Sequence, residues 1–171
     1  MNHQLSYIPK KEIERILSFE IDDITMTNLI SAISRINTLY MINNAGSGHI
    51  GTSFSSMDLL SYIFLKFNIT NEKHTDLFFS SKGHDAPAIY SMMSIFNLIE
   101  FDKIHGLRTL NGLPGHPDVE TDGIITNTGS LGMGISKAKG FIQSSRLEGI
   151  NRNVYVLMGD GELQEGQNWE A

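Results

Sequence analysis

Three of the six histidines directly follow a glycine, in the pairs Gly48-His49, Gly83-His84 and Gly115-His116. With 16 glycines in 171 residues, chance placement would give fewer than one such pair. Glycine permits tight turns, and residues on such turns can approach a ligand closely. The pairs therefore mark candidate functional histidines. Exposed histidines that only contact solvent in ordinary turns remain the alternative.

A further candidate, Asp160, lies between two glycines directly after the apolar, β-prone run Val154–Met158. Ligands of parallel sheets gather beyond the carboxyl ends of the strands, and glycines let an anion approach the backbone. Mg²⁺ prefers oxygen ligands and completes its coordination shell with phosphate oxygens. Asp160 is thus a candidate Mg²⁺ ligand beside a phosphate group, although Asp-Gly sequences are also common in plain turns.

Glycines are also frequent in the segment Thr128–Gly134, where they occupy positions 129, 132 and 134. Their order, Gly-x-x-Gly-x-Gly, is the reverse of the dinucleotide-binding fingerprint, so the sequence argues against a Rossmann fold. Backbone N–H and C=O groups at such a helix entry can bind a ring or a phosphate. Close packing of the following helix on a sheet would explain the same glycines equally well.

Taken in chain order, five motifs resemble the N-terminal, diphosphate-binding domain of transketolase. The motifs are Ser47-Gly48-His49, Ser81-Lys82-Gly83-His84, Pro114-Gly115-His116-Pro117, Thr128–Gly134 and Gly159–Gly166. The resemblance covers residues 25–171, and residues 1–24 are expected to form an N-terminal extension. It implies an α/β fold with a parallel sheet flanked by helices. In that family, thiamine diphosphate and Mg²⁺ lie between two domains at a dimer interface.

The resemblance implies cofactor roles for several residues. Asp160 would bind the metal, Gly161 would contact the diphosphate, and His84 would lie near the diphosphate and the thiazolium. Main-chain groups of Gly129 and Leu131 would bind the aminopyrimidine ring. Together with Glu165, these positions form the implied cofactor site within this chain.

The resemblance also implies roles in substrate binding and in the dimer. His49 and His116 would face the hydroxyl groups of a sugar, and with His84 they are the expected catalytic residues, because an imidazole near its pKa both donates and accepts protons. Glu165 would link the two cofactor sites across the dimer. The implied reaction moves a two-carbon ketol unit from a ketose phosphate to an aldose phosphate, as in the pentose phosphate part of carbohydrate metabolism.

The chain departs from the family pattern toward its end. In the family a second metal ligand, an asparagine, follows a further strand, and Asn168 is too close to Asp160 to replace it. The glutamate that activates the aminopyrimidine belongs to a second domain. We therefore expect an incomplete domain, inactive alone, that needs a C-terminal pyrimidine-binding domain or subunit in a homodimer or heterotetramer. One alternative is a non-catalytic remnant that binds a partner. Another is a zinc hydrolase that uses three histidines, but the sequence contains no His-x-x-x-His pair to support it.

Helices and short strands must position these motifs. Apolar residues at helical spacing predict helices from Thr25 to about Asn43, from about Ser56 to Phe67, over Pro87–Leu98, and from Gly134 to about Arg146. The first of these could be capped by Asp23 or Thr25, and a short helix through Thr109 by Asp102. Apolar runs predict strands at Leu77–Phe79, Ile124–Thr126 and Val154–Met158, the last buried on both faces of a parallel sheet.

The composition narrows the classes of function. The chain has 19 acidic and 13 basic residues, a formal charge of −6, and no basic run, which argues against nucleic-acid binding. Since it has no cysteine, disulfides, thiolate zinc sites and cysteine nucleophiles are excluded. The longest apolar stretch, Leu59–Phe67, is far shorter than the roughly 20 residues that span a bilayer. With no signal pattern at the N-terminus, a soluble cytoplasmic protein is expected.

Overall fold

The computed structural model describes residues 5–67, 69–70, 72 and 75–171. The chain divides into two compact units, Met1–Lys66 with His84–Gly115 and Phe67–Gly83 with His116–Ala171. It therefore passes between the units three times. Two of these passages fall at the peptide bonds that join Gly83 to His84 and Gly115 to His116.

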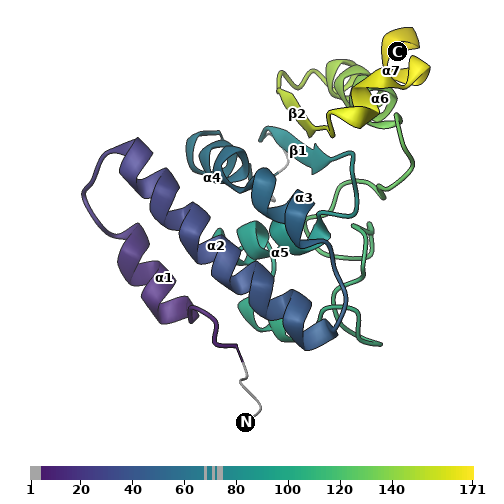
Figure 1. Ribbon diagram of the computed structural model, residues 1–171. Helices are drawn as coiled ribbons and strands as arrows, with labels where there is room; N and C mark the ends of the chain where they lie inside the picture. The colour runs from purple at the N-terminus through teal and green to yellow at the C-terminus, as the bar shows by residue number, and fades with distance from the viewer. Residues whose placement is uncertain (1–4, 68, 71, 73–74) are drawn as a thin grey trace. The chain divides into compact units, whose positions relative to one another are not determined.

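The first unit is helical. It contains α1 (Lys10–Leu17), α2 (Asp23–Ala45), α3 (Ile50–Ser55), α4 (Met57–Lys66), α5 (Ala86–Ile95) and the 3-10 helix η1 (Phe101–Gly106). The long helix α2 is central and packs against each of the others (Figure 1). Ile30 and Met41 of α2 are 0% exposed, and every residue of α5 is buried. The core of this unit therefore lies between α2, α4 and α5.

Helix α2 begins after Asp22, not at either of the caps that the sequence suggested. Oδ1 of Asp22 accepts hydrogen bonds from the backbone N–H groups of Ile24 and Thr25, each at 3.0 Å. These bonds satisfy donors that have no partner within the first helical turn. Asp23 is already helical, and the Thr25 hydroxyl donates to the other Asp22 oxygen at 2.6 Å. The prediction of a cap at Asp23 or Thr25 is therefore wrong.

Other helix boundaries in this unit agree with the sequence or differ by a few residues. Helix α4 confirms the predicted helix after Ser56, whereas α3 was not predicted, because its glycine and hydroxyl side chains disfavour helix interiors. Helix α5 ends at Ile95 rather than Leu98. Asp102 lies inside η1, which follows Glu100 and has no side-chain cap, so its predicted capping role is wrong.

The second unit contains a parallel pair of strands, β1 (Leu77–Ser80) and β2 (Val154–Leu157), with Leu77 opposite Val154 and Ser80 opposite Leu157. Its helices are α6 (Gly134–Leu147), the 3-10 helix η2 (Gly161–Gln164) and α7 (Gly166–Glu170). Helix α6 packs against β2, and α7 packs against α6 (Figure 1). These elements confirm the predicted strands at 77–79 and 154–158, the predicted helix to about residue 146, and an α/β fold with a parallel sheet.

Two details of the predicted sheet are wrong. Ile124–Thr126 is not a strand, because the Ile124 N–H donates to the Thr121 carbonyl at 3.0 Å in a local turn instead of bonding to a neighbouring strand. Three of the four residues of β2 are only half-buried, so the strand is not buried on both faces. Among the described residues β2 pairs with β1 alone, which leaves its other edge open.

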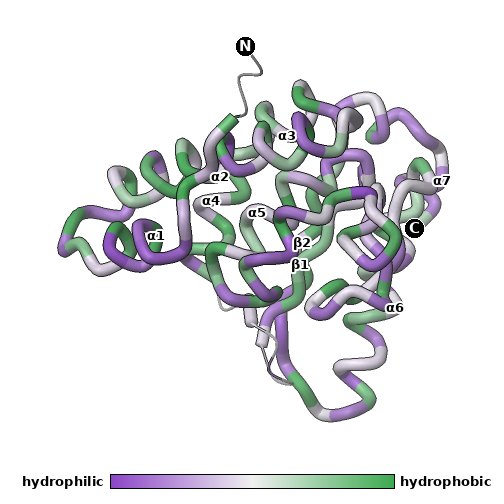
Figure 2. Tube along the Cα trace, turned by 90° about the horizontal axis from the view of Figure 1, so that it is seen from below, coloured by the Kyte–Doolittle hydropathy of each residue, from purple (hydrophilic) through white to green (hydrophobic). Residues whose placement is uncertain are grey.

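Hydrophilic and hydrophobic residues are interspersed along the chain (Figure 2). Within the described residues, no helix combines the length and the apolar character that crossing a membrane requires. Large apolar side chains nevertheless reach the surface of the second unit, among them Leu131 and Trp169, which are 61% and 80% exposed.

Candidate functional site

The two strands of the second unit end at the same edge of the sheet. Strand β1 continues into Ser81-Lys82-Gly83, and β2 continues into the Asp160 turn, Gly159–Gly161. The Ser81 N–H donates to the Leu157 carbonyl at 2.8 Å, which holds the two exits side by side. Because strands in a parallel pair run in one direction, this edge is the carboxyl end at which α/β proteins bind ligands.

The segment Thr128–Gly134, here called the glycine turn, packs closely onto the exit of β1. Gly83 has a φ of +72°, and a Cβ there would lie 2.7 Å from both the N and Cα atoms of Gly129. Gly129 itself has a φ of +116°. The His116 ring lies against both glycines, since Cβ atoms on Gly83 and Gly129 would come 2.8 Å and 3.1 Å from its Cδ2. The imidazole is therefore held against bare backbone while His116 remains exposed.

The last glycine of the turn has a packing role. Gly134 is the first residue of α6 and is buried. A Cβ there would lie 2.5 Å from Oγ of Ser81 and 3.0 Å from Cγ1 of Val156. For Gly134 the packing explanation is thus correct, because a side chain would push α6 away from both strand exits.

Glu162 connects the exit of β1, the glycine turn and the Asp160 turn. It was not identified as a functional residue from the sequence. It is only 3% exposed. Its Oε1 accepts from the Ser81 hydroxyl at 2.5 Å and from the Gly132 N–H at 3.0 Å, and its Oε2 accepts from the Gly159 N–H at 3.2 Å. Buried carboxylates need such partners. A glutamate two residues after Asp160 in a polar turn carries no sequence signal that separates it from an exposed one.

Asp160, by contrast, is exposed at the tip of its turn. No atom lies within 4 Å of the position of a Cβ on Gly161, so the backbone beside the carboxylate is open. Among the described residues, no three His, Cys, Asp or Glu side chains are grouped to hold a metal ion. A single carboxylate fits Mg²⁺, which usually keeps several waters and takes phosphate oxygens as further ligands. The zinc centre of three histidines receives no support from this arrangement.

The glycine turn presents further groups suited to a ligand. Oγ1 of Thr128 is buried and has no hydrogen-bond partner in the described part of the protein. Leu131 is 61% exposed at the tip of the turn. The side chain of exposed Glu165 packs onto the turn, because a Cβ on Gly132 would lie 3.0 Å from Cβ of Glu165. The predicted positions Gly129, Leu131, Asp160, Gly161 and Glu165 therefore all belong to the same unit and to neighbouring turns.

The other two candidate histidines belong to the first unit. Their ring centroids are 5.4 Å apart, and the rings meet edge to face at 78°. His49 is exposed and immediately precedes α3, whereas His84 is half-buried two residues before α5. The structure thus brings His49 and His84 together within one unit, and places His116 against Gly83 and Gly129 within the other.

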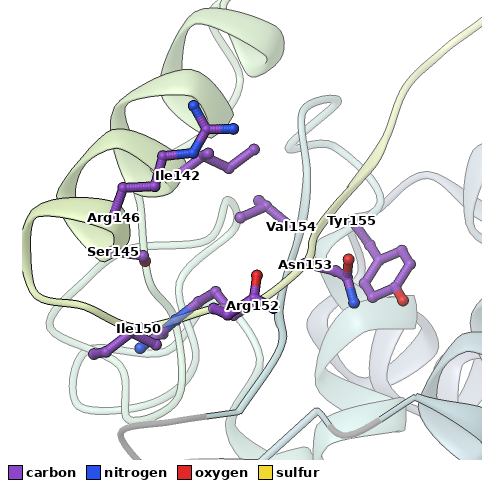
Figure 3. Close-up of a pocket in the computed structure, with 9 residues that line it drawn as sticks. Ile142, Ser145, Arg146, Ile150, Arg152, Asn153, Val154 and Tyr155 are labelled. Atoms are coloured by element: carbon purple, nitrogen blue, oxygen red, sulfur yellow. The ribbon is translucent and has the colours of Figure 1, made fainter.

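A cavity of about 340 Å³ lies near the opposite end of β2 (Figure 3). Its lining comes from the end of α6, the following loop and the start of the strand: Ile142, Ser145, Arg146 and Ile150–Tyr155. Figure 3 shows the Arg146 guanidinium extending alongside Ile142 rather than toward Arg152. The two arginines therefore do not converge, and none of the predicted site residues lines this cavity.

The profile of the family described as "Transketolase, thiamine diphosphate binding domain" matches residues 25–171. The chain belongs to this family. The transketolase resemblance read from the five motifs is thereby confirmed. A solved transketolase from Leishmania mexicana has the same fold, with a TM-score of 0.70 and 24% identity over 96% of this chain and 25% of that one.

Relatives of this transketolase-family chain include proteins named as transketolases and proteins named as transketolase subunits. One subunit of the apulose-4-phosphate transketolase of Actinobacillus succinogenes is 34% identical over 147 residues, which cover 82% of this chain and 53% of that protein. The 6-deoxy-6-sulfo-D-fructose transketolase subunit SqwG of a Clostridium species is 33% identical over 78% of this chain and 51% of its own length. Human transketolase is 33% identical over 80% of this chain and 23% of its own length. The chain thus spans about half the length of the subunits it matches.

Proposed function

We propose that this chain supplies the diphosphate-binding part of a transketolase, an enzyme that transfers a two-carbon ketol unit from a ketose phosphate to an aldose phosphate. The observation that carries the proposal is the shared edge where the glycine turn and the Asp160 turn meet the exits of β1 and β2. Such an edge presents the open backbone of Gly161 and the exposed carboxylate of Asp160 to a ligand. Family membership and the names of the relatives support the same reaction class.

The cofactor would be thiamine diphosphate with Mg²⁺. Asp160 would hold the metal through a carboxylate oxygen, and the open backbone at Gly161 would admit the diphosphate. Main-chain groups of Gly129 and Leu131 would orient the ring at the other end. When bound, the cofactor supplies carbanion stabilisation for breaking and forming a carbon–carbon bond.

The histidines would bind the sugar and move protons. A neutral imidazole can accept a proton from one hydroxyl and donate to another near neutral pH. The edge-to-face arrangement of His49 and His84 orients their two rings differently, so the pair would contact more than one hydroxyl group. His116, held against Gly83 and Gly129, would present its imidazole at the glycine turn.

A partner would complete the site. We infer that a pyrimidine-binding domain or subunit, in a homodimer or a heterotetramer, carries the remaining groups of the cofactor site. Two relatives are themselves named as subunits, which supports a split enzyme. The exposed Glu165 would then face the neighbouring cofactor site across the interface.

The test is native mass spectrometry of the protein as isolated from its source, with thiamine diphosphate and Mg²⁺ present, followed by a transfer assay with ketose and aldose phosphates. We expect a longer chain or a two-subunit complex that carries the cofactor and transfers the ketol unit. The Asp160→Asn variant removes the proposed metal ligand, and its spectrum should lack the added mass of bound Mg²⁺ and thiamine diphosphate. A lone chain that binds no cofactor would contradict the proposal and favour a non-catalytic remnant.

A further inference from the structure

Three segments that are distant in sequence meet at one buried carboxylate. Ser81 follows β1, Gly132 lies in the glycine turn, and Gly159 follows β2. Each donates one hydrogen bond to Glu162, at 2.5, 3.0 and 3.2 Å. Two of these donors are 81 and 30 residues away from Glu162 along the chain. Glu162 is therefore a common anchor for the three segments.

The geometry requires a carboxylate at this position. Oε1 accepts two hydrogen bonds and Oε2 accepts one, so both oxygens act as acceptors. An amide has one oxygen and one NH₂ group. In Glu162→Gln the NH₂ group must therefore face a backbone N–H, that of Gly159 in one orientation or that of Gly132 in the other. Either way a backbone donor, buried at Gly132 or partly buried at Gly159, loses its acceptor, and such a loss is destabilising.

We propose that Glu162 is a positioning residue that holds the glycine turn and the Asp160 turn in their binding geometry before any ligand arrives. This inference rests on the proposed function, because it takes those two turns to be the cofactor site. Glu162 itself is 3% exposed and does not reach the open side of either turn, where Leu131 and Asp160 are exposed. It therefore acts through Gly132 and Gly159 and not by contact with the cofactor. Pre-formed sites bind more tightly because less ordering is needed on binding.

Amide hydrogen exchange in the cofactor-free protein tests this role directly. In Glu162→Gln, exchange at Gly132 or Gly159 should accelerate about tenfold or more, as loss of one buried hydrogen bond predicts. The Leu77 amide, which donates to the Asn153 carbonyl at 2.9 Å at the far end of β1, should exchange as before and reports on the fold. Glu148→Gln removes the same charge from an exposed glutamate after α6 and should change none of the three.

Cofactor titration by calorimetry, with the pyrimidine-binding domain or subunit present, gives the second readout. We expect Glu162→Gln to bind thiamine diphosphate with Mg²⁺ about tenfold more weakly or worse, while Glu148→Gln binds like the wild type. If Glu162→Gln does not fold, Ser81→Ala removes a single bond to Oε1 and should accelerate exchange at Gly132 by a smaller factor. Unchanged exchange at both Gly132 and Gly159 would overturn the positioning role. Wild-type protein that binds no cofactor even with its pyrimidine-binding partner present would overturn the proposed function instead, and the exchange data would still decide the role of Glu162 in holding the turns.

Discussion

Replacing Gly134 with alanine would place a methyl group in space that Ser81 and Val156 already occupy. The new Cβ would lie 2.5 Å from Oγ and 2.6 Å from Cβ of Ser81, and 3.0 Å from Cγ1 of Val156. The Ser81 Cβ is fixed by the strand exit and cannot rotate away. Overpacking of this kind costs about 1–3 kcal/mol. Alanine is also a better helix former by about 0.5–1 kcal/mol, but Gly134 is the first residue of α6, so that gain is small there.

We therefore expect Gly134→Ala to lower the free energy of unfolding by about 1–2 kcal/mol. The same helix offers a matched control. Gly140 also lies in α6, it is exposed, and nothing lies within 4 Å of a Cβ at this position. Gly140→Ala should raise the free energy of unfolding by about 0.5–1 kcal/mol, because only the helix propensity changes.

Chemical denaturation of the three proteins, followed by circular dichroism, measures both effects. The difference between the two variants should be about 1.5–3 kcal/mol, or roughly 3–12 °C in Tm for a chain of this size. Cofactor affinity should fall only in Gly134→Ala, because α6 begins at the glycine turn. Equal stabilities for the two variants would refute the close packing of Gly134 against the strand exits.

Three further outcomes are expected. Gly83→Ala should destabilise the protein by about 1–3 kcal/mol in denaturant melts, since its backbone has a φ of +72° and its Cβ would meet Gly129 at 2.7 Å; a wild-type melt would contradict that contact. Hydrogen bonding from Arg35 lowers the pKa of Asp58 below 3.8, so this pair stabilises the protein above that pH and its contribution is lost as pH falls through the lower, folded-state pKa. Because Asp58 is 65% exposed, Asp58→Asn should lower the free energy of unfolding by at most about 1 kcal/mol at pH 7. The variant should also lose less stability than the wild type when the pH is lowered through the acid range, and an equal loss in both proteins would contradict the role of this pair. Asp160→Asn should leave the Tm of the ligand-free protein unchanged and abolish the rise in Tm that thiamine diphosphate and Mg²⁺ produce, and a retained rise would show that Asp160 is not the metal ligand.

The elements that sequence patterns predicted well are those that depend on local periodicity. Strand β2 and helix α4 both follow from runs of apolar residues with the spacing of their own element. The wrong predictions concern features that depend on hydrogen bonds, either to a neighbouring strand or at a helix N-terminus. Ile124–Thr126 has the composition of a strand but bonds within a local turn instead of to a neighbouring strand. Helix α2 is capped by Asp22, one residue before Asp23 and three before Thr25, because Asp22 accepts two backbone hydrogen bonds.

Some residues of the candidate site could also be predicted from local sequence motifs, and others could not. Asp160 and Gly129 could be singled out because each follows from a local motif with a known chemical use. Glu162 could not, since its role depends on three segments that meet only in the folded protein. Gly134 was correctly placed at a helix entry, but whether it serves packing or ligand binding could be decided only from its distance to Ser81.

The pairing of β1 with β2 has a consequence for the order in which this protein is made. Asp76, which precedes β1, hydrogen-bonds to Asn153, which precedes β2, across 77 residues of chain. Ribosomes add about 5–20 residues per second, so β1 is synthesised roughly 4–15 s before its partner strand. During that interval the run Leu77–Phe79 has no strand to pair with and is available for intermolecular contacts. The helical first unit needs only the chain up to Gly115, so it can fold before β2 is synthesised.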